Sequence, residues 1–304
     1  MKKIKTLLVI AGPTAIGKTS LAIYLAKHFD TEIISADSRQ FYKEMSIGTA
    51  KPTENEMQGI IHHFIGHISI HQNYNAGKFE TDVLNKLGDL FREKDIVIMC
   101  GGSGLFIDAV CNGFDEFDEI DPAIRKKLNA EFKEKGILWL QNQVKEKDPA
   151  YFNRADIHNP HRLLRALEVF IGTGKTFSSL KTGQKKERPF NIIKILLDTD
   201  RKIIYERINE RTEIMMQQGW LQEANSLLPF RSLNALNTVG YKELFDHLEG
   251  KISFERCIEL IKQNTRRYAK RQLTWFKKDE EYTSFEPGEE EKIKSFLEMV
   301  IPEL

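Results

Sequence analysis

The sequence predicts an α/β fold in which helices flank a parallel sheet, with a helical insertion domain added to this core. Short apolar runs bounded by glycine or by polar turns alternate with segments of helical periodicity, which is typical of parallel sheets with crossover helices. One long central stretch, by contrast, is rich in charged helices and poor in strand signals. A chain of 304 residues also exceeds the usual size of a single domain, which fits a core with an insertion.

The first expected element is a strand that leads into a phosphate-binding loop. Residues 7–11 (LLVIA) have the length and content of a buried strand, and residues 20–29 continue with helical periodicity. The intervening residues match G-x-x-x-x-G-K-[ST] at every fixed position. They are Gly12, Pro13, Thr14, Ala15, Ile16, Gly17, Lys18 and Thr19. This order of strand, loop and helix predicts a P-loop NTPase-like core.

The chemistry of this loop is anion binding. Its glycines let successive backbone N–H groups point inward, and the N-terminus of the following helix adds a partial positive charge. Lys18 supplies a cation for terminal phosphates, and the Thr19 hydroxyl is expected to hold Mg²⁺. The loop therefore predicts a di- or triphosphate ligand, with ATP left open, and does not identify the group that carries the phosphates.

Composition limits the class of protein. The chain is 41% hydrophobic and 29% charged, and no apolar run approaches the length of about 20 residues that spans a membrane. Cys100, Cys111 and Cys257 form no C-x-x-C pair, so neither a disulfide framework nor a zinc site is predicted, and a reducing cytoplasm fits. The net charge of +1 conceals a basic segment in the C-terminal third.

A second strand is expected at residues 32–35, and it delivers Asp37 and Ser38 just beyond its carboxyl end. Ligands of open α/β sheets bind outside the carboxyl ends of the strands, so we expect Asp37 to stand beside the phosphate loop. Two functional roles are open to Asp37: a magnesium ligand, or a general base that faces a second substrate. A solvated aspartate in a turn is the structural alternative.

A further buried strand is predicted at residues 95–100 (DIVIMC), followed by a glycine-rich turn that contains Ser103. Small residues at the carboxyl end of a strand allow a ligand to approach closely, which makes Ser103 a candidate site residue, with a plain turn serine as the alternative. No carboxylate ends this strand, so the usual second magnesium ligand is missing there.

Three histidines, His62, His63 and His67, lie in an irregular region between residues 39 and 71. A metal site is not favoured, because the glutamate of H-E-x-x-H is missing and the surrounding residues are not helical in pattern. A helix is expected next, over residues 74–92.

The insertion is predicted from a run of charged helices at residues 122–135, 138–147 and 160–171, with Gly172 ending the last of them. The strand at residues 191–198 (NIIKILLD) then returns the chain to the core. We therefore assign residues 1–114 and 190–304 to the core, and residues 115–189 to the helical insertion.

The last long helix carries a basic face. Residues 262–278 contain seven basic residues and no acidic one, while Ile261, Tyr268 and Trp275 belong to an apolar stripe that is expected to pack on the core. A basic face backed by a core face is suited to phosphate-backbone binding, whereas a merely solvated helix usually mixes charges of both signs. On an earlier helix, Arg207 and Arg211 stand four residues apart and share one face.

Taken together, these segments resemble one family, the bacterial-type tRNA dimethylallyltransferases, also called tRNA isopentenyltransferases. The resemblance runs through nearly the whole chain, in GPTAIGKT, ISADSRQFYKEMSIGTAKP, the HH pair, NAGKF, GGSGLF, PHRLLRALEVF, TVGYKE and AKRQLTWF. A phosphate loop alone occurs in many enzymes, but this combination is specific to the family.

The resemblance implies an activity: transfer of a dimethylallyl group from dimethylallyl diphosphate to N6 of adenosine 37 in tRNA, with release of diphosphate. The loop then holds a diphosphate leaving group, with Mg²⁺ as cofactor. The implied partners are dimethylallyl diphosphate and the anticodon stem-loop of tRNA, with no membrane, and the implied state is a cytoplasmic monomer. A P-loop small-molecule kinase and a nucleotide-regulated RNA-binding module are the rival interpretations.

The resemblance also assigns roles by position. Asp37 matches the family's base for the adenine amine, and Ser103 stands where threonine is common, which keeps a hydroxyl near the amine. Phe106 stands where many members have tyrosine. Either Arg207 or Arg211 resembles the arginine that neutralises the diphosphate, and spacing does not choose between them. The positions implied to contact tRNA are Asp37, Ser38, Arg39, Gln40, Ser103, Arg125, His161, Arg162, Leu163, Leu164, Arg165, Gly240, Tyr241, Lys242, Lys270, Arg271, Gln272, Trp275 and Lys277.

Overall fold

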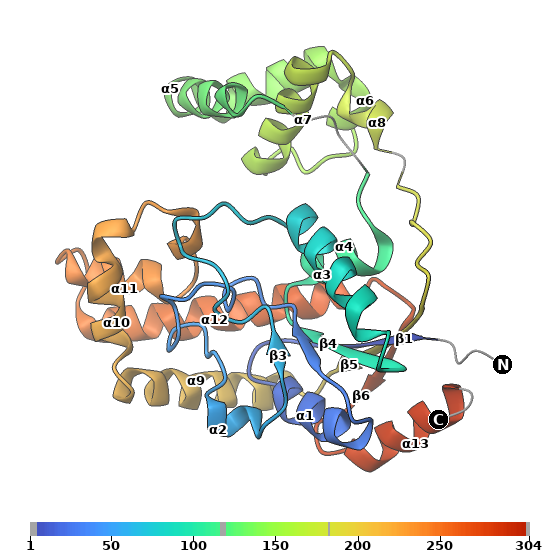
Figure 1. Ribbon diagram of the computed structural model, residues 1–304. Helices are drawn as coiled ribbons and strands as arrows, with labels where there is room; N and C mark the ends of the chain where they lie inside the picture. Colours follow the sequence, from blue (N-terminus) through green and yellow to red (C-terminus); the bar gives the residue numbers. More distant parts are fainter. Residues whose placement is uncertain (1–4, 116–119, 182, 302–304) are drawn as a thin grey trace. The chain divides into compact units, whose positions relative to one another are not determined.

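The first of the two units of the chain is built on a six-stranded sheet in which all neighbouring strands are parallel, in the order β3-β2-β4-β1-β5-β6 (Figure 1). The computed structural model describes residues 5–115, 120–181 and 183–301. The strands are β1 (Thr6–Ala11), β2 (Ile33–Ser35), β3 (His62–His63), β4 (Ile96–Gly101), β5 (Asn191–Leu197) and β6 (Tyr282–Phe285). The predicted α/β fold with a parallel sheet is confirmed. The sequence had not predicted β3 and β6, which are too short to show a strand pattern.

The chain divides into two compact units, Met1–Cys111 with Arg188–Leu304 and, between them in sequence, Asn112–Glu187. The sequence had placed these boundaries at residues 115 and 189. The helices of the first unit are α1 (Lys18–His28), α2 (Glu54–Met57), α3 (Ala76–Leu90), α4 (Gly104–Asn112), α9 (Arg201–Gln217), α10 (Trp220–Leu227), α11 (Tyr241–Leu248), α12 (Phe254–Phe276) and α13 (Glu290–Val300), with the 3-10 turns η1 (Leu228–Phe230) and η2 (Asn234–Leu236). Those of the second unit are α5 (Pro122–Lys147), α6 (Pro149–Phe152), α7 (Pro160–Thr173) and α8 (Phe177–Leu180).

The central strand β1 contributes to two cores, one on each face of the sheet. Successive side chains of a strand point to opposite faces, so Leu7 and Val9 pack in one core and Leu8 and Ile10 in the other. Helices α3, α4, α10 and α11 cover the first face, and α1, α9 and α13 cover the second. Helix α12 contributes to both cores, which ties the C-terminal part of the chain to the phosphate loop.

The register of the sheet brings three loops together. Ala11 pairs with Gly101 and Ser35 pairs with Cys100, so the loops that follow β1, β4 and β2 begin at the same edge. This is the edge where open parallel sheets bind their ligands. Gly101 is required there, because a Cβ atom would lie 2.3 Å from the carbonyl oxygen of Ala36.

The second unit has its own small core of leucines, valine and aromatic residues from α5, α6 and α7. Helix α5 is interrupted at Gly136, which has a φ of 77° and lies in the gap between the two helices expected here. The prediction that Gly172 ends the next helix is wrong. Helix α7 continues to Thr173, and Gly174, with a φ of 72°, caps it in the left-handed conformation. Gly172 instead leaves room for Ile120, since a Cβ atom would lie 2.6 Å from that side chain.

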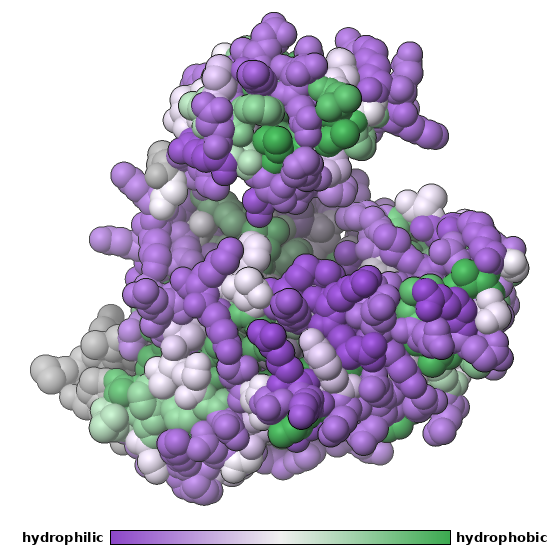
Figure 2. Space-filling view, turned by 180° about the vertical axis from the view of Figure 1, so that it is seen from behind, coloured by the Kyte–Doolittle hydropathy of each residue, from purple (hydrophilic) through white to green (hydrophobic). Residues whose placement is uncertain are grey.

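The surface is mainly hydrophilic on the face drawn in Figure 2, with apolar patches among the charged side chains. Within residues 5–115, 120–181 and 183–301, no helix combines the length and the apolar content that crossing a bilayer requires.

Candidate active site

A large cavity of about 840 Å³ opens at the carboxyl edge of the sheet, within the first unit. Its walls come from the phosphate loop, from the segments that follow β2 and β4, and from α9, α11 and α12. Helix α12 lines it over four turns at spacings of three and four residues, through Leu260, Ile261, Asn264, Thr265, Tyr268, Arg271, Gln272 and Trp275. A cavity of this size suits small-molecule substrates.

The phosphate loop has the backbone expected from its motif. Gly17 adopts a φ of 106° immediately before α1, a conformation that favours glycine, and Ala15 has a φ of 64°. The Lys18 ammonium donates to the carbonyl oxygen of Pro13 at 2.6 Å, so it folds back over the loop. Thr14 contributes to the wall of the cavity.

Gln272 joins the phosphate loop to the turn after β4. Its Oε1 accepts the backbone N–H of Thr14 at 3.0 Å, and its Nε2 donates to the carbonyl oxygen of Gly102 at 2.8 Å. The side chain is buried. Gln272, which the family resemblance implies to contact tRNA, thus holds two active-site loops together in this structure.

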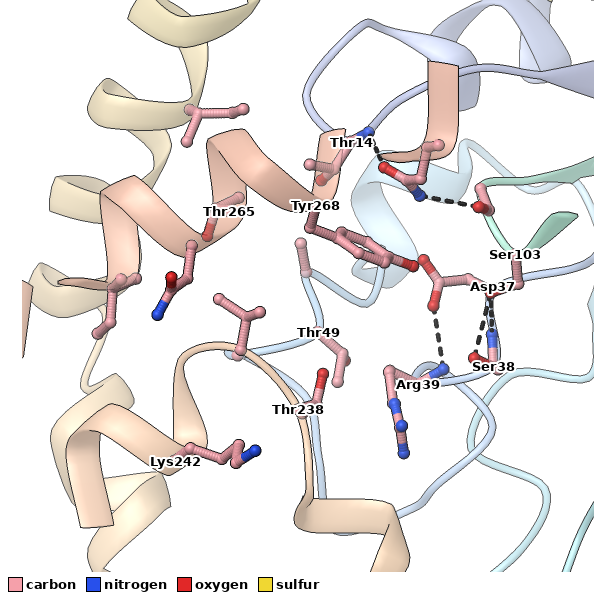
Figure 3. A pocket seen from close by; sticks show the side chains of 18 of the residues that line it. Thr14, Asp37, Ser38, Arg39, Thr49, Ser103, Thr238, Lys242, Thr265 and Tyr268 are labelled. Carbon is pink, nitrogen blue, oxygen red and sulfur yellow. Dashed lines mark hydrogen bonds between the residues drawn. The ribbon is translucent and has the colours of Figure 1, made fainter. Parts of the chain in front are cut away.

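Asp37, Ser38 and Ser103 form a polar cluster in the cavity (Figure 3). The Asp37 Oδ1 accepts the backbone N–H of Arg39 at 3.0 Å, which fixes the carboxylate in its turn. The Ser103 hydroxyl accepts the backbone N–H of Ser38 at 3.0 Å and donates to the Ser38 hydroxyl at 3.1 Å. The turn after β2, with Asp37 and Ser38, and the turn after β4, with Ser103, thus meet in one site.

Tyr268 is a site residue that the sequence reasoning missed. It was assigned to an apolar stripe packed on the core, but its hydroxyl points toward the Asp37 carboxylate (Figure 3) and lies within hydrogen-bonding reach of Ser103. Burial raises the pKa of Tyr268 to about 12, the charge of Asp37 adds to this shift, and the hydrogen bond with Ser103 opposes it. A tyrosine in an apolar helical stripe has no sequence signal that separates a core position from a cavity wall.

The structure distinguishes the two arginines of α9. The Arg211 guanidinium donates to the Thr14 hydroxyl at 3.3 Å and lines the cavity. Burial lowers the pKa of Arg211, an effect that Asp37 and Glu56 oppose. Arg207 donates instead to the carbonyl oxygen of Ile16 at 3.1 Å and lines a smaller pocket of about 340 Å³ behind the loop. Of the two, Arg211 faces the space that a phosphate group in the cavity would occupy.

Charged groups surround the Lys18 ammonium. Burial lowers the pKa of Lys18 to about 8, while Cys100 and Asp37 oppose the shift and Arg211 adds to it. Burial in turn raises the pKa of the Cys100 thiol to about 11. At neutral pH the loop therefore presents an ammonium next to a guanidinium, which is a site for a multiply charged anion.

Arg39 and Gln40 have structural partners of their own. The Arg39 guanidinium donates to the carbonyl oxygens of Asn234 and Ala235 at 3.1 and 3.0 Å. The Gln40 amide donates to those of Thr49 and Ala50 at 3.2 and 3.0 Å. Both residues were expected to contact tRNA. In this structure their side chains shape the loops around the cavity, and only Arg39 lines it.

Gly240 and Tyr241, which the family resemblance implies to contact tRNA, are both buried in this structure. Tyr241 is completely buried, and its hydroxyl donates to Glu223 at 2.5 Å. Gly240 is buried, with a φ of 94°. Lys242, in contrast, is exposed and lines the cavity. Of these three residues, Lys242 is the exposed one.

The basic face of α12 is smaller than the sequence predicted. Lys262 is paired with Glu213 of α9, and Arg266 donates to Asn209 of the same helix at 2.8 Å. These two cations therefore face α9. The exposed basic residues are Arg267, Lys270, Arg271, Lys277 and Lys278, and Trp275 beside them is also exposed. Among them, Lys277 pairs with Asp198, and the Trp275 indole donates to Asp108 at 2.9 Å.

In the second unit, the predicted tRNA contacts divide into exposed and buried residues. His161 and Arg162 are exposed at the start of α7. Arg125 and Arg165 both pair with Glu168, at 3.3 and 2.9 Å. Leu163 and Leu164 are buried in the core of the unit, where they stabilise the helix that carries the exposed His161 and Arg162.

The residues at the loop fit the Mg²⁺ predicted from Thr19. Thr19 is exposed in the first turn of α1. Across the part of the chain that the structure describes, no group of three His, Cys, Asp or Glu side chains could hold a metal ion. A single protein hydroxyl, that of Thr19, is compatible with Mg²⁺, because this ion usually keeps several waters and takes substrate phosphates as ligands rather than a cage made by the protein. Of the three histidines, His63 is paired with Glu32 at 2.5 Å.

Comparison with known proteins gives consistent results. A family model described as IPP transferase matches residues 40–279. The chain is similar to the tRNA dimethylallyltransferase of Christiangramia forsetii, with 54% identity over 94% of this chain and 95% of the relative. It is also similar to the tRNA dimethylallyltransferase of Cytophaga hutchinsonii, with 47% identity over 98% of both chains.

Two solved structures share the fold. The full-length tRNA isopentenylpyrophosphate transferase of Bacillus halodurans has a TM-score of 0.72 and 33% identity, over 97% of this chain and 95% of that one. A eukaryotic dimethylallyltransferase described as acting on tRNA has a TM-score of 0.73 and 29% identity, over 89% of this chain and 69% of that one.

Proposed function

The chain belongs to the IPP transferase family of tRNA dimethylallyltransferases, and from this premise we propose how its cavity performs the family's reaction. The reaction transfers a dimethylallyl group from dimethylallyl diphosphate to N6 of adenosine 37 in tRNA and releases diphosphate. The C1–O bond of the allylic diphosphate breaks with its electrons going to the diphosphate. The amine lone pair forms the new C1–N bond, and one amine proton must leave.

The leaving diphosphate needs its developing charge stabilised. We assign this to the amides of the phosphate loop, to Lys18 and to Arg211, which approach the loop from different elements. Fixed donors in a partly dehydrated site stabilise such charge strongly, since they need no reorganisation during the reaction. Arg211 is chosen over Arg207 because it lines the cavity beside Thr14. Mg²⁺, held by the Thr19 hydroxyl, the substrate oxygens and water, would add further charge neutralisation.

The amine proton passes to Asp37 in this proposal. The exocyclic amine of adenine is a poor nucleophile, and a carboxylate that accepts its proton as the bond forms assists the attack. The carboxylate is held by the Arg39 N–H on one side, while Tyr268 and Ser103 lie around it (Figure 3). Ser103 offers a hydroxyl beside the same amine and keeps the turn after β2 in position through Ser38.

The tRNA partner is proposed to bind through its anticodon stem-loop, and adenosine 37 must turn out of the stack to reach Asp37. Exposed cations of α12 and of α7 are available for its phosphates. Phosphate contacts position an RNA, whereas its bases are read by side chains that reach them, such as those of Asp37 and Lys242 at the cavity. We further propose that the chain acts as a monomer in the cytoplasm, where tRNA is modified.

One observation carries this proposal: the carboxylate of Asp37 and Thr14 of the phosphate loop line the same cavity. A direct test incubates the protein with Mg²⁺, unmodified tRNA and dimethylallyl diphosphate labelled in its allylic carbons, beside a reaction with ATP labelled in its terminal phosphate. Allylic label in the tRNA supports the proposal. Terminal phosphate passed to a small molecule, without label in the tRNA, would favour a kinase instead.

The pKa of Lys18 gives a pH dependence. The charged ammonium binds the diphosphate, so affinity should be highest below about pH 8, where free Lys18 keeps its proton. As pH rises above this value, binding must take up a proton, and affinity for dimethylallyl diphosphate should fall by about tenfold per pH unit. Titration of binding between neutral and alkaline pH measures the bend. In Lys18→Ala, affinity for dimethylallyl diphosphate should be low, and the plot of log affinity against pH should show no change of slope near pH 8. The same change of slope in that variant would assign the titration to another group.

The exposed cations of α12 predict a salt-dependent effect. Changing Arg267, Lys270 and Arg271 together to glutamine should weaken tRNA binding similarly for substrate and non-substrate tRNAs. The slope of log affinity against log salt should flatten by roughly one unit for each lost phosphate contact. Lys262 and Arg266 changed to glutamine provide a matched control of like chemistry, because their partners lie on α9. Unchanged tRNA affinity in the triple variant at several salt concentrations would leave the second unit to carry the binding.

A further inference from the structure

Trp220 forms a wall of the cavity beside the path that an allylic chain would take. It begins α10 directly after Gly219, is buried, and lines the cavity together with Met215 of α9. Resting on the proposed function, we propose that Trp220 limits the length of the allylic chain, so that five-carbon diphosphates are used in preference to ten-carbon ones.

The path of the chain follows from α9. Arg211, at the diphosphate end, and Met215 are four residues apart and lie on one face of the helix, and both line the cavity. A dimethylallyl group has three bonds of about 1.5 Å in line from C1 to its methyl end, which is less than one helical turn of about 5.4 Å. Such a chain ends near Met215. A ten-carbon chain has seven such bonds in line and extends past Met215 into the next turn, where α9 ends and Trp220 follows.

Trp220 cannot move aside to admit a longer chain, because two glycines hold its indole closely. A Cβ atom on Gly48 would lie 2.1 Å from its Nε1, and a Cβ atom on Gly240 would lie 2.1 Å from its Cζ2. The indole thus fills the space between two backbone segments from distant parts of the sequence. Close packing of this kind resists displacement of the indole, because the neighbouring backbone would have to move with it.

Glu223 holds the backbone segment that packs against Trp220. Its carboxylate accepts three successive backbone N–H groups, those of Ser46, Ile47 and Gly48, at 2.9, 2.8 and 2.9 Å. It also accepts the hydroxyl of Tyr241, whose ring stands edge-on to Trp220 with centroids 6.0 Å apart. A carboxylate seated in a row of backbone donors is a strong anchor. Glu223 is accordingly a positioning residue for the segment that closes on Trp220.

The test compares kcat/KM for dimethylallyl diphosphate and for geranyl diphosphate, with the same unmodified tRNA as acceptor. In Trp220→Leu, the preference for five over ten carbons should fall by about 10- to 200-fold, the range in which apolar pockets discriminate added methylenes. Glu223→Gln should shift the preference in the same direction by a smaller factor. Trp139→Leu, a matched change in the second unit, should leave the preference unchanged.

A preference that stays the same in a folded Trp220→Leu protein, with native circular dichroism and unchanged affinity for tRNA, overturns the inference. Where that variant does not fold, Met215→Ala widens the same path and must lower the preference for the inference to hold. Failure of the proposed function is a separate result, because the wild-type protein would then transfer no five-carbon group to tRNA at all.

Discussion

Replacing Asp37 by alanine is expected to lower kcat for dimethylallyl transfer by about 10²- to 10⁴-fold, the usual contribution of a general base. Affinity for tRNA should remain nearly intact. The reason is local: the carboxylate lies in the cavity, held by the N–H of Arg39 at 3.0 Å, and is the group best placed to take the amine proton. Single-turnover transfer with labelled dimethylallyl diphosphate measures the chemical step without product release.

Asp37→Asn is the matched control for this prediction. Asparagine keeps the oxygen that accepts the Arg39 N–H but loses the ability to take a proton, so it should be almost as slow as alanine. Near-normal turnover in either variant would mean that Asp37 is not the general base and only shapes the turn after β2. Recovery of the rate at high Mg²⁺ concentration would make it a metal ligand instead.

The second large effect is expected at Arg211. Changing Arg211 to glutamine should lower kcat/KM for dimethylallyl diphosphate by about 10²- to 10³-fold, as does the loss of a fixed donor at a developing charge in other enzymes. The guanidinium stands beside Thr14 in the cavity, where it can reach the leaving group. Steady-state kinetics with saturating tRNA measure this loss.

Arg207→Gln separates electrostatics from loop structure. Both arginines project from α9 and donate to the phosphate loop, so both variants lose one hydrogen bond to it. Arg207, however, faces the pocket behind the loop, and its replacement should cost less than about tenfold, within the modest worth of one hydrogen bond. Equal losses in the two variants would mean that the arginines only support the loop.

Much of the core could be predicted because its signals are local. The phosphate loop follows a strand and precedes a helix within one short segment, and four of the six strands were located to within one residue at each end. The meeting of Asp37 with Ser103 followed from a general rule, since parallel strands bring their carboxyl ends to one edge.

What the sequence could not predict depends on contacts between distant segments. Tyr268 and Gln272 lie on a helix whose amphipathic pattern looks the same whether a side chain packs on the core or lines a cavity. Glu223 resembles any surface glutamate until its backbone partners 175 or more residues away are known. Tyr241, in a family motif, donates a hydrogen bond to the Glu223 carboxylate from a fully buried position.

In the proposed reaction, one cavity brings the allylic diphosphate and the amine of adenosine 37 together. The most direct measurement incubates the protein with unmodified tRNA, Mg²⁺ and labelled dimethylallyl diphosphate, then quantifies released diphosphate and maps the label by nucleoside mass spectrometry. We expect one diphosphate for each labelled tRNA, with all the label on N6 of adenosine 37. Label on another nucleoside, or diphosphate released without labelled tRNA, would contradict it.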